Sequence, residues 1–257
     1  MTVIPDSVGR RLTGRVPHDR IRAVDVPRHD RSLVEQLLTL PDLSSAVADA
    51  MDEIGIGTVL GTSVLSPVAP GQRLCGPAVT LRYVRATADP TVIRSARRHL
   101  AVGDRDLYGL ARPGDVAVFD CSGNRDWAVL GGLSALWAAK AGLAGCVVDG
   151  AIRDSDTITE VALPVYSTSR SPRAARHRVD AVALNDMVTI AGATVCPGDY
   201  VIADDDGICL VPFEDFPAVV ASATSAQAAE DVLVEAIRTS TDIEDLVTRT
   251  KVPRVPD

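Results

Sequence analysis

The sequence predicts an α/β protein whose helices and strands form layers around one hydrophobic core. Two observations predict this class. Strand-like and helical segments alternate between residues 116 and 148, and short apolar runs separated by turns then continue to residue 211. The first pattern is typical of a sheet covered by helices, and the second is typical of additional strands. We therefore expect a single layered domain with an N-terminal arm and C-terminal helices.

Helix and strand patterns alternate in the first half of this domain. Pro41 separates two amphipathic helix patterns, and Ser44 or Ser45 is a suitable N-cap for the second helix. Runs rich in β-branched residues, bounded by glycine turns, predict the strands. The expected elements are helices at Ser32–Leu40 and up to Asp52, a strand at Ala78–Val84, a helix at Thr91–Leu100 and a strand at Val116–Asp120.

The second half of the domain is richer in strands. Residues 129–141 are rich in alanine and leucine, and we expect them to become helical after Gly131-Gly132. Glycine and proline turns separate the later apolar runs. The expected strands are Gly145–Val148, Val165–Ser167, Val188–Ile190, Tyr200–Ala203 and Gly207–Val211, followed by helices at Phe216–Arg238 and Ile243–Thr248.

Composition excludes some functional classes. With 46% hydrophobic and 23% charged residues, the 257-residue chain is ordinary for a soluble globular protein. It has no apolar run of membrane-spanning length and no signal peptide, so we expect a cytoplasmic protein without a membrane partner. The net charge of −8 argues against a nucleic-acid partner. The arm of residues 1–31 holds seven arginines against four aspartates, and we expect it to be mobile and solvated, with contact to an anionic partner as the alternative.

A polar pair follows one of the buried strands. The run from Cys146 to Asp149 is expected to end in a turn at Gly150, which places Arg153 and Asp154 side by side. Arginine offers a planar fork for a carboxylate, and aspartate is an oxygen ligand suited to Mg²⁺ or Mn²⁺. The pair could hold a 2-oxo acid, with the arginine on its carboxylate and the metal on its carbonyl. A salt-bridged loop pair without a function is the alternative.

The segment Gly131-Gly132-Leu133-Ser134 begins a helix, and first-turn N–H groups are free to face an anion. In a βαβ-type layer, the start of this helix and the end of the following strand can lie on the same rim. A carboxylate could then receive two backbone N–H bonds together with the guanidinium of Arg153. A plain glycine start of a packed helix is the alternative.

Other polar groups are weaker candidates. The turn Asp204-Asp205-Asp206-Gly207 lacks the spacing of a calcium loop, and we expect a solvated hairpin turn. The basic loop Arg170–Arg178 is expected to be solvated, or alternatively to bind a second carboxylate. The histidines are scattered and predict no histidine-rich metal site. The cysteines lack metal-site spacing, and those in apolar contexts are expected to be reduced and buried: Cys75, Cys146, Cys196 and Cys209.

The chain resembles the family of 4-hydroxy-4-methyl-2-oxoglutarate aldolases (class II pyruvate aldolases), which also holds regulator of ribonuclease activity A. The resemblance covers about residues 32–215, and leaves residues 1–31 as an arm and 216–257 as a helical tail. Each motif alone is weak, but the ordered set is fairly specific. The motifs are Asp49-Ala50-Met51-Asp52, Gly71–Thr80, Gly131-Gly132-Leu133, Val147–Asp154, and Cys196-Pro197-Gly198-Asp199 through Asp204-Asp205-Asp206-Gly207.

The resemblance implies an αββα-type layered sandwich of the swivelling β/β/α kind, assembled as a homotrimer or homohexamer with active sites at subunit interfaces. It also implies a lyase that uses Mg²⁺ or Mn²⁺ to cleave a carbon–carbon bond of a 2-oxo acid, by retro-aldol release of pyruvate or by decarboxylation of oxaloacetate. Arg153 would hold the pyruvyl group and stabilise its enolate, and Asp154 would bind the metal. After Gly131 and Gly132, the N–H groups of Leu133 and Ser134 would bind the substrate carboxylate.

Two positions depart from the pattern of the aldolases. These enzymes commonly carry an acidic residue twenty-one positions before the arginine and another three positions after the aspartate, where this chain has Gly132 and Thr157. Metal hydration and proton transfer would suffer unless Asp156, Asp120 or an acid from a neighbouring subunit compensates. Two alternatives therefore stay open: a non-catalytic regulator of the ribonuclease type, and the same scaffold acting on another enolisable, carboxylated substrate.

Overall fold

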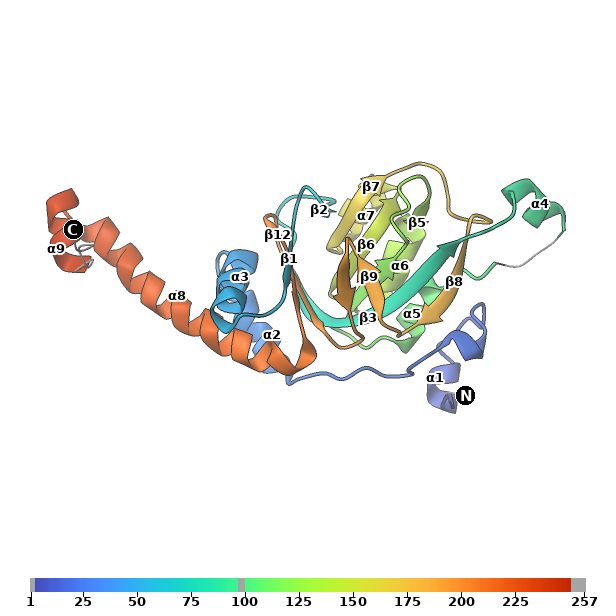
Figure 1. Ribbon diagram of the computed structural model, residues 1–257, viewed down its shortest axis with the longest axis horizontal. Helices are drawn as coiled ribbons and strands as arrows, with labels where there is room; N and C mark the ends of the chain where they lie inside the picture. The colour runs from blue at the N-terminus through green and yellow to red at the C-terminus, as the bar shows by residue number, and fades with distance from the viewer. Residues whose placement is uncertain (1–2, 97–99, 251–257) are drawn as a thin grey trace.

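The centre of the molecule is a ten-stranded mixed sheet that curves nearly into a barrel, with helices on its outside (Figure 1). The computed structural model describes residues 3–96 and 100–250. The predicted α/β class, with one layered domain and C-terminal helices, is confirmed. The main path of the sheet is β1 (Thr58–Gly61), β12 (Gly207–Val211), β11 (Tyr200–Ala203), β3 (Leu74–Arg85), β4 (Val116–Asp120), β6 (Gly145–Ile152), β7 (Val165–Arg170) and β2 (Ser66–Pro67), with β5 (Ala128–Leu130) beside β6 and β8 (Val179–Leu184) beside β3.

Alternating side chains divide the molecule into four layers. In β4, Ala117 and Phe119 pack toward one group of helices, whereas Val116 and Val118 point into the space between the two halves of the sheet. In β12 the same alternation directs Ile208 and Leu210 into that space and places Cys209 against other helices. Because strand side chains alternate between faces, each half of the sheet is covered on both sides. The order is helix, sheet, sheet, helix, as the resemblance implies.

Helices cover the two outer faces of the sheet. One face carries α5 (Asp104–Leu110), α6 (Gly132–Lys140) and α7 (Ser155–Val161). The other carries α2 (Arg31–Leu38), α3 (Leu43–Ile54) and the first turns of α8 (Phe216–Thr239). The remaining elements are α1 (Asp6–Gly9), α4 (Pro90–Ser95), α9 (Ile243–Thr250), the hairpin of β9 (Val188–Ile190) and β10 (Ala193–Val195), and short 3₁₀ turns at His18–Arg20 and Phe213–Asp215.

Three local predictions were wrong. Gly150 does not form a turn but lies inside β6, where a Cβ atom would come within 2.8 Å of the Cys121 Cβ, so glycine permits close strand packing. Ser44 does not cap α3, because its N–H and hydroxyl groups bond to the Asp204 carboxylate. The helix expected at Thr91–Leu100 ends at Ser95, and Leu100 is not helical. Residues 97–99 lie outside the described residues.

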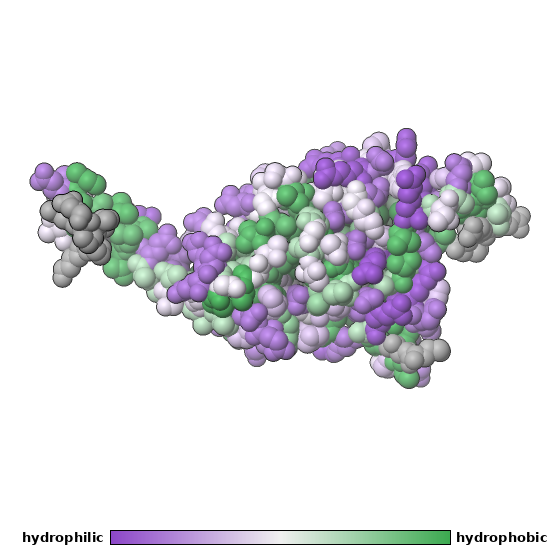
Figure 2. Space-filling view, viewed as in Figure 1, coloured by the Kyte–Doolittle hydropathy of each residue, from purple (hydrophilic) through white to green (hydrophobic). Residues whose placement is uncertain are grey.

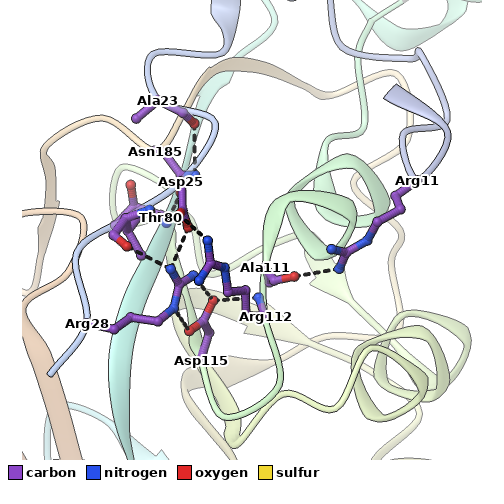
Figure 3. Close-up of polar contacts among 10 residues, drawn as sticks. Arg11, Ala23, Asp25, Arg28, Thr80, Ala111, Arg112, Asp115 and Asn185 are labelled. Atoms are coloured by element: carbon purple, nitrogen blue, oxygen red, sulfur yellow. Dashed lines mark hydrogen bonds and ion pairs between the residues drawn. The ribbon is translucent and has the colours of Figure 1, made fainter. Parts of the chain in front are cut away.

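The arginine-rich arm is packed against the domain, contrary to the expectation of a mobile, solvated segment. Val16 and Ile21 are buried in the same core as α5 and β8. The Arg28 guanidinium donates to both oxygens of the Asp115 carboxylate, at 2.8 and 2.7 Å, and Asp115 is completely buried (Figure 3). Beside this pair, the half-exposed Asp25 forms ion pairs with Arg28 and with Arg112. The arm is therefore attached by apolar contacts and by a buried ion pair.

The C-terminal helices project from the domain (Figure 1). Only the first turns of α8 are buried, at Phe216, Val219, Val220 and Ala223. Farther along, Val232 and Ile237 are exposed, and Figure 2 shows green, apolar residues on this projecting part. Among the described residues, no helix combines the length and the apolar character that crossing a membrane requires.

Candidate active site

A cavity of about 170 Å³ lies where α6 begins and β6 ends. Its wall contains Leu133 and Ser134 from the first turn of α6, and Arg153 and Asp154 from the loop after β6. The structure therefore brings together the two polar groups that the sequence placed on one rim. Gly131 lies in the same wall, and the N–H of Gly132 donates a hydrogen bond to the Asp154 side chain.

The Arg153-Asp154 pair is held directly against the start of α6. The Arg153 N–H donates to the Leu130 carbonyl, and the Gly132 N–H donates to the Asp154 Oδ2 at 3.1 Å. The Arg153 Nε lies 3.4 Å from the same carboxylate oxygen. Asp154 has a left-handed backbone with φ of 57°, a conformation that is uncommon outside glycine and often marks functional sites. Both side chains stay partly exposed, so each can reach a ligand in the cavity.

Gly131 is required by this close approach. A Cβ atom there would lie 2.7 Å from the Asp154 Oδ2 and 3.1 Å from the Arg153 Nε. The backbone of Gly131 is extended, so the requirement is for space rather than for an unusual φ. The glycine pair therefore brings the N–H groups of the helix close to the charged pair.

A Gly131→Ala substitution should displace the charged pair without unfolding the protein. The atoms in the way belong to side chains that can move, so the melting temperature should change by only a few degrees. A displacement of about 1 Å at a reacting centre can cost about 100-fold in rate, and we expect a loss of about 10- to 100-fold in kcat/KM. Gly61→Ala is the matched control, because its added Cβ meets no atom within 4 Å. Equal activity of the two variants would contradict the role given to Gly131.

The two departures from the aldolase pattern are neighbours in space. A Cβ atom on Gly132 would lie 2.8 Å from the Thr157 Cγ2 and 2.9 Å from the Thr157 Cβ. Thr157 stands in the first turns of α7, directly over the start of α6. An acidic side chain at position 132 would therefore need Thr157 to move. The residue type allowed at position 132 thus depends on the residue at position 157.

The cavity wall also contains an acidic residue that the sequence analysis missed. Asp104 begins α5 and is 6% exposed. Its Oδ2 accepts a hydrogen bond from the Ser134 Oγ at 2.7 Å, and the Tyr108 hydroxyl lies 2.9 Å from the same Ser134 oxygen. Burial raises the pKa of Asp104, although the Ser134 hydrogen bond and the charges of Arg105 and Arg15 oppose this effect. The local signal, Asp104-Arg105-Asp106, resembles an exposed charged loop, so the sequence gives no hint of burial.

Guanidinium groups from separate segments stand around the cavity. Arg15 comes from the arm, Arg105 from α5 and Arg176 from the loop before β8. The Arg105 guanidinium lies over the Trp137 ring at 5.0 Å. Of the basic loop Arg170–Arg178, the residues Ala174, Ala175 and Arg176 line the cavity. Arg170 instead donates to the Val68 carbonyl and Arg178 to the Ala174 carbonyl.

Several other sequence candidates lie elsewhere. The predicted hairpin turn joins β11 and β12. It is not solvated throughout, because Asp204 is buried and bonds to Ser44, whereas Asp205 accepts from the Gly71 N–H. Asp120 and Asp156, considered as replacements for the missing acids, are not in the cavity wall. Four of the free cysteines are buried, but Cys196 is exposed, contrary to the prediction.

Of the two acidic side chains in the cavity wall, Asp154 is the exposed one and is the candidate to hold a divalent metal. Within residues 3–96 and 100–250, no cluster of three or more histidine, cysteine or acidic side chains could hold a metal by itself. Mg²⁺ usually keeps several waters and binds through one or two carboxylates together with oxygens of the substrate. The partly exposed Asp154 carboxylate fits the protein's share of such an arrangement.

A family model described as RraA-like, Aldolase/RraA, matches residues 44–210. Protein DlpA of Legionella pneumophila is 27% identical over 213 residues, which are 83% of this chain but only 33% of DlpA. A Halalkalibacterium halodurans protein, provisionally named 4-hydroxy-4-methyl-2-oxoglutarate aldolase, is 28% identical over 79% of this chain and 88% of its own length.

Solved structures show the same fold. An uncharacterised protein from Pseudomonas syringae pv. tomato superposes with a TM-score of 0.71 at 27% identity, and covers 89% of this chain and 97% of its own. RraAS2 of Streptomyces coelicolor, described as an unusual member of the RNase ES inhibitor RraA protein family, gives a TM-score of 0.66 at 28% identity over 80% of this chain and 97% of its own. The relatives thus include both aldolase and ribonuclease-inhibitor names.

Proposed function

Because the chain belongs to the RraA-like family, we propose that it is a metal-dependent lyase that cleaves a carbon–carbon bond of a 2-oxo acid. The reaction is retro-aldol release of pyruvate, decarboxylation of oxaloacetate, or both. The observation that carries the proposal is the placement of Arg153 and Asp154 against the N–H groups of α6 at one cavity. A site built only for protein contact does not need this convergence of anion-binding groups.

The residues of the site divide the work on a 2-oxo acid. The first-turn N–H groups of Leu133 and Ser134 bind the carboxylate, since helix N-termini favour anions. Arg153 contacts the carbonyl oxygen of the substrate. It stabilises the negative charge that develops there as the enolate forms, where preorganised charge has its largest effect. Asp154 holds Mg²⁺ or Mn²⁺, which when bound supplies Lewis-acid polarisation of the substrate carbonyl. Gly131 keeps these groups close enough to share one small ligand.

We further propose that the protein assembles as a homotrimer or homohexamer with its sites at the subunit interfaces. The exposed face of α6 supports this, because Leu133, Leu136 and Trp137 are all exposed beside the cavity. Exposed apolar groups of this kind commonly mark protein contacts. Sedimentation equilibrium that finds only monomers would contradict the assembly.

A non-catalytic regulator of ribonucleases is the second candidate function. It is favoured by the loss of acidic side chains at Gly132 and Thr157 and by the likeness to RraAS2. Under this alternative the charged cavity would have no substrate, and the protein would form a stoichiometric complex with a ribonuclease without binding Mg²⁺.

Pyruvate release distinguishes these functions. Purified protein is given oxaloacetate and, separately, 4-hydroxy-4-methyl-2-oxoglutarate with Mg²⁺ or Mn²⁺, and pyruvate is followed with lactate dehydrogenase. We expect turnover that EDTA abolishes and that added Mg²⁺ restores. Absence of turnover with no Mg²⁺ binding by calorimetry would favour the regulator, whereas metal binding without turnover would indicate another enolisable substrate.

A further inference from the structure

We propose that Asp104 is the acid that gives a proton to the enolate formed in the cavity, a role that rests on the proposed lyase function. Asp104 lines the same cavity as Arg153 and Asp154 but lies on α5, away from the positions where related aldolases carry their acidic residues. Of the two acidic side chains in the cavity wall, Asp154 is engaged by Arg153 and by the Gly132 N–H. The proposed function also assigns Asp154 to the metal, which leaves Asp104, held by the Ser134 hydroxyl, as the acid for proton transfer.

The surroundings of Asp104 suit this role. Its Oδ2 accepts a hydrogen bond from the Ser134 Oγ. The backbone N–H of Ser134 belongs to the first turn of α6, which is proposed to bind the substrate carboxylate. The carboxyl group is thus fixed beside the place where the substrate is held. Burial favours the neutral form of Asp104 and raises its pKa, the direction that suits a group that gives a proton.

The proton balance closes with water as the co-reactant. When the carbon–carbon bond breaks, its electron pair stays on the pyruvate half as an enolate. The enolate carbon takes the proton of the Asp104 carboxyl group, and the carboxylate left behind takes up one proton from the solvent. In the retro-aldol reaction the hydroxyl proton of the substrate passes to solvent, and in decarboxylation the other product is carbon dioxide. In reverse, the Asp104 carboxylate removes a methyl proton from pyruvate.

This reverse step gives a direct test that requires no cleavable substrate. Pyruvate in D₂O with Mg²⁺ should exchange its methyl protons in the presence of the protein, as followed by proton NMR. Asp104→Asn should slow this exchange by about 100-fold or more. The dissociation constant of oxalate, a mimic of the enolate, should change by less than about threefold. Asp120→Asn is the matched control, since Asp120 is equally buried at 6% exposure but lies outside the cavity wall.

The outcomes separate this inference from the proposed function. If Asp104→Asn exchanges methyl protons as fast as the wild-type protein while both release pyruvate, the inference is wrong and the lyase function stands. If the wild-type protein neither exchanges protons nor releases pyruvate, both fail. Loss of exchange in Asp104→Asn, with oxalate binding kept and Asp120→Asn active, supports the role of Asp104.

A second variant decides the matter if Asp104→Asn does not fold. Ser134→Ala keeps the backbone N–H but removes the hydroxyl donor that lowers the pKa of Asp104. Exchange needs the carboxylate form, so its rate rises with pH through this pKa. The rise should therefore move to higher pH in Ser134→Ala, and an unmoved profile would overturn the proposal.

The neighbouring groups do not account for such a profile. Burial raises the pKa values of Tyr83 and Tyr108 far above their usual range, and that of Cys146 to about 12, so these groups stay neutral during the assay. The charged groups that face Asp104 from the arm and from α5 are Arg15 and Arg105, while Arg153 and Asp154 lie in the same cavity wall.

Discussion

Replacing Arg153 with alanine should lower kcat/KM for pyruvate release by about 1,000-fold while the protein keeps its fold. The guanidinium lies at the rim of the cavity, partly exposed, so its removal costs little stability. Its loss removes a charge-assisted donor from the place where the proposed reaction develops enolate charge, an effect of about 100- to 1,000-fold for a single donor, and it also removes the partner of Asp154. Arg153→Lys should recover only part of the loss, because an ammonium group cannot offer a planar fork.

Arg173→Ala is the control for this result. Arg173 belongs to the basic loop and is exposed, but it does not line the cavity. We expect its activity to stay within about twofold of wild type. Circular dichroism and melting curves should show that both variants are folded. If Arg153→Ala retains near-wild-type activity, the assignment of this cavity as the active site is wrong.

Asp115→Ala should be the most destabilising of the substitutions considered. Asp115 is fully buried, and its carboxylate accepts two bonds from Arg28 and one from the Arg112 N–H (Figure 3). Removing one partner of a buried ion pair costs about 3–5 kcal/mol, and here it leaves Arg28 with only the half-exposed Asp25. For a chain of this size, that corresponds to a melting temperature lower by about 6–20 °C.

Asp25→Ala is the matched control, because Asp25 pairs with the same arginine but is half exposed. A surface pair of this kind contributes less than about 1 kcal/mol. Urea unfolding of the two variants measures the difference. Equal midpoints would mean that the arm is solvated, as its composition suggested, and is not anchored by Arg28 and Asp115.

The sequence predicted the fold class, and the placement of the Arg153-Asp154 pair beside the start of α6, because both depend on local patterns. Apolar runs identified the central strands, and a glycine pair identified the start of α6. The Arg153-Asp154 pair followed a strand whose end could be placed beside that helix. These inferences needed no knowledge of distant contacts.

The errors arose where distant residues decide the outcome. The Asp106 carboxylate accepts bonds from the backbone of Thr13 and Val16, and these partners allow the charged segment of α5 to be buried. The arm looked solvated because its arginines are numerous, yet Asp115 neutralises Arg28 from 87 residues away. Gly150 looked like a turn, but β5 pairs with the two residues after it and extends β6 to Ile152.

Mg²⁺-dependent pyruvate release by the wild-type protein and by Asp154→Ala tests the central claim most directly. Both proteins are assayed with oxaloacetate while Mg²⁺ is titrated, and Mg²⁺ binding is followed by calorimetry. The account predicts saturable, EDTA-sensitive turnover for the wild type, and for the variant a loss of at least about 100-fold that excess Mg²⁺ does not restore. Turnover that is equal in both proteins, or indifferent to EDTA, would contradict it.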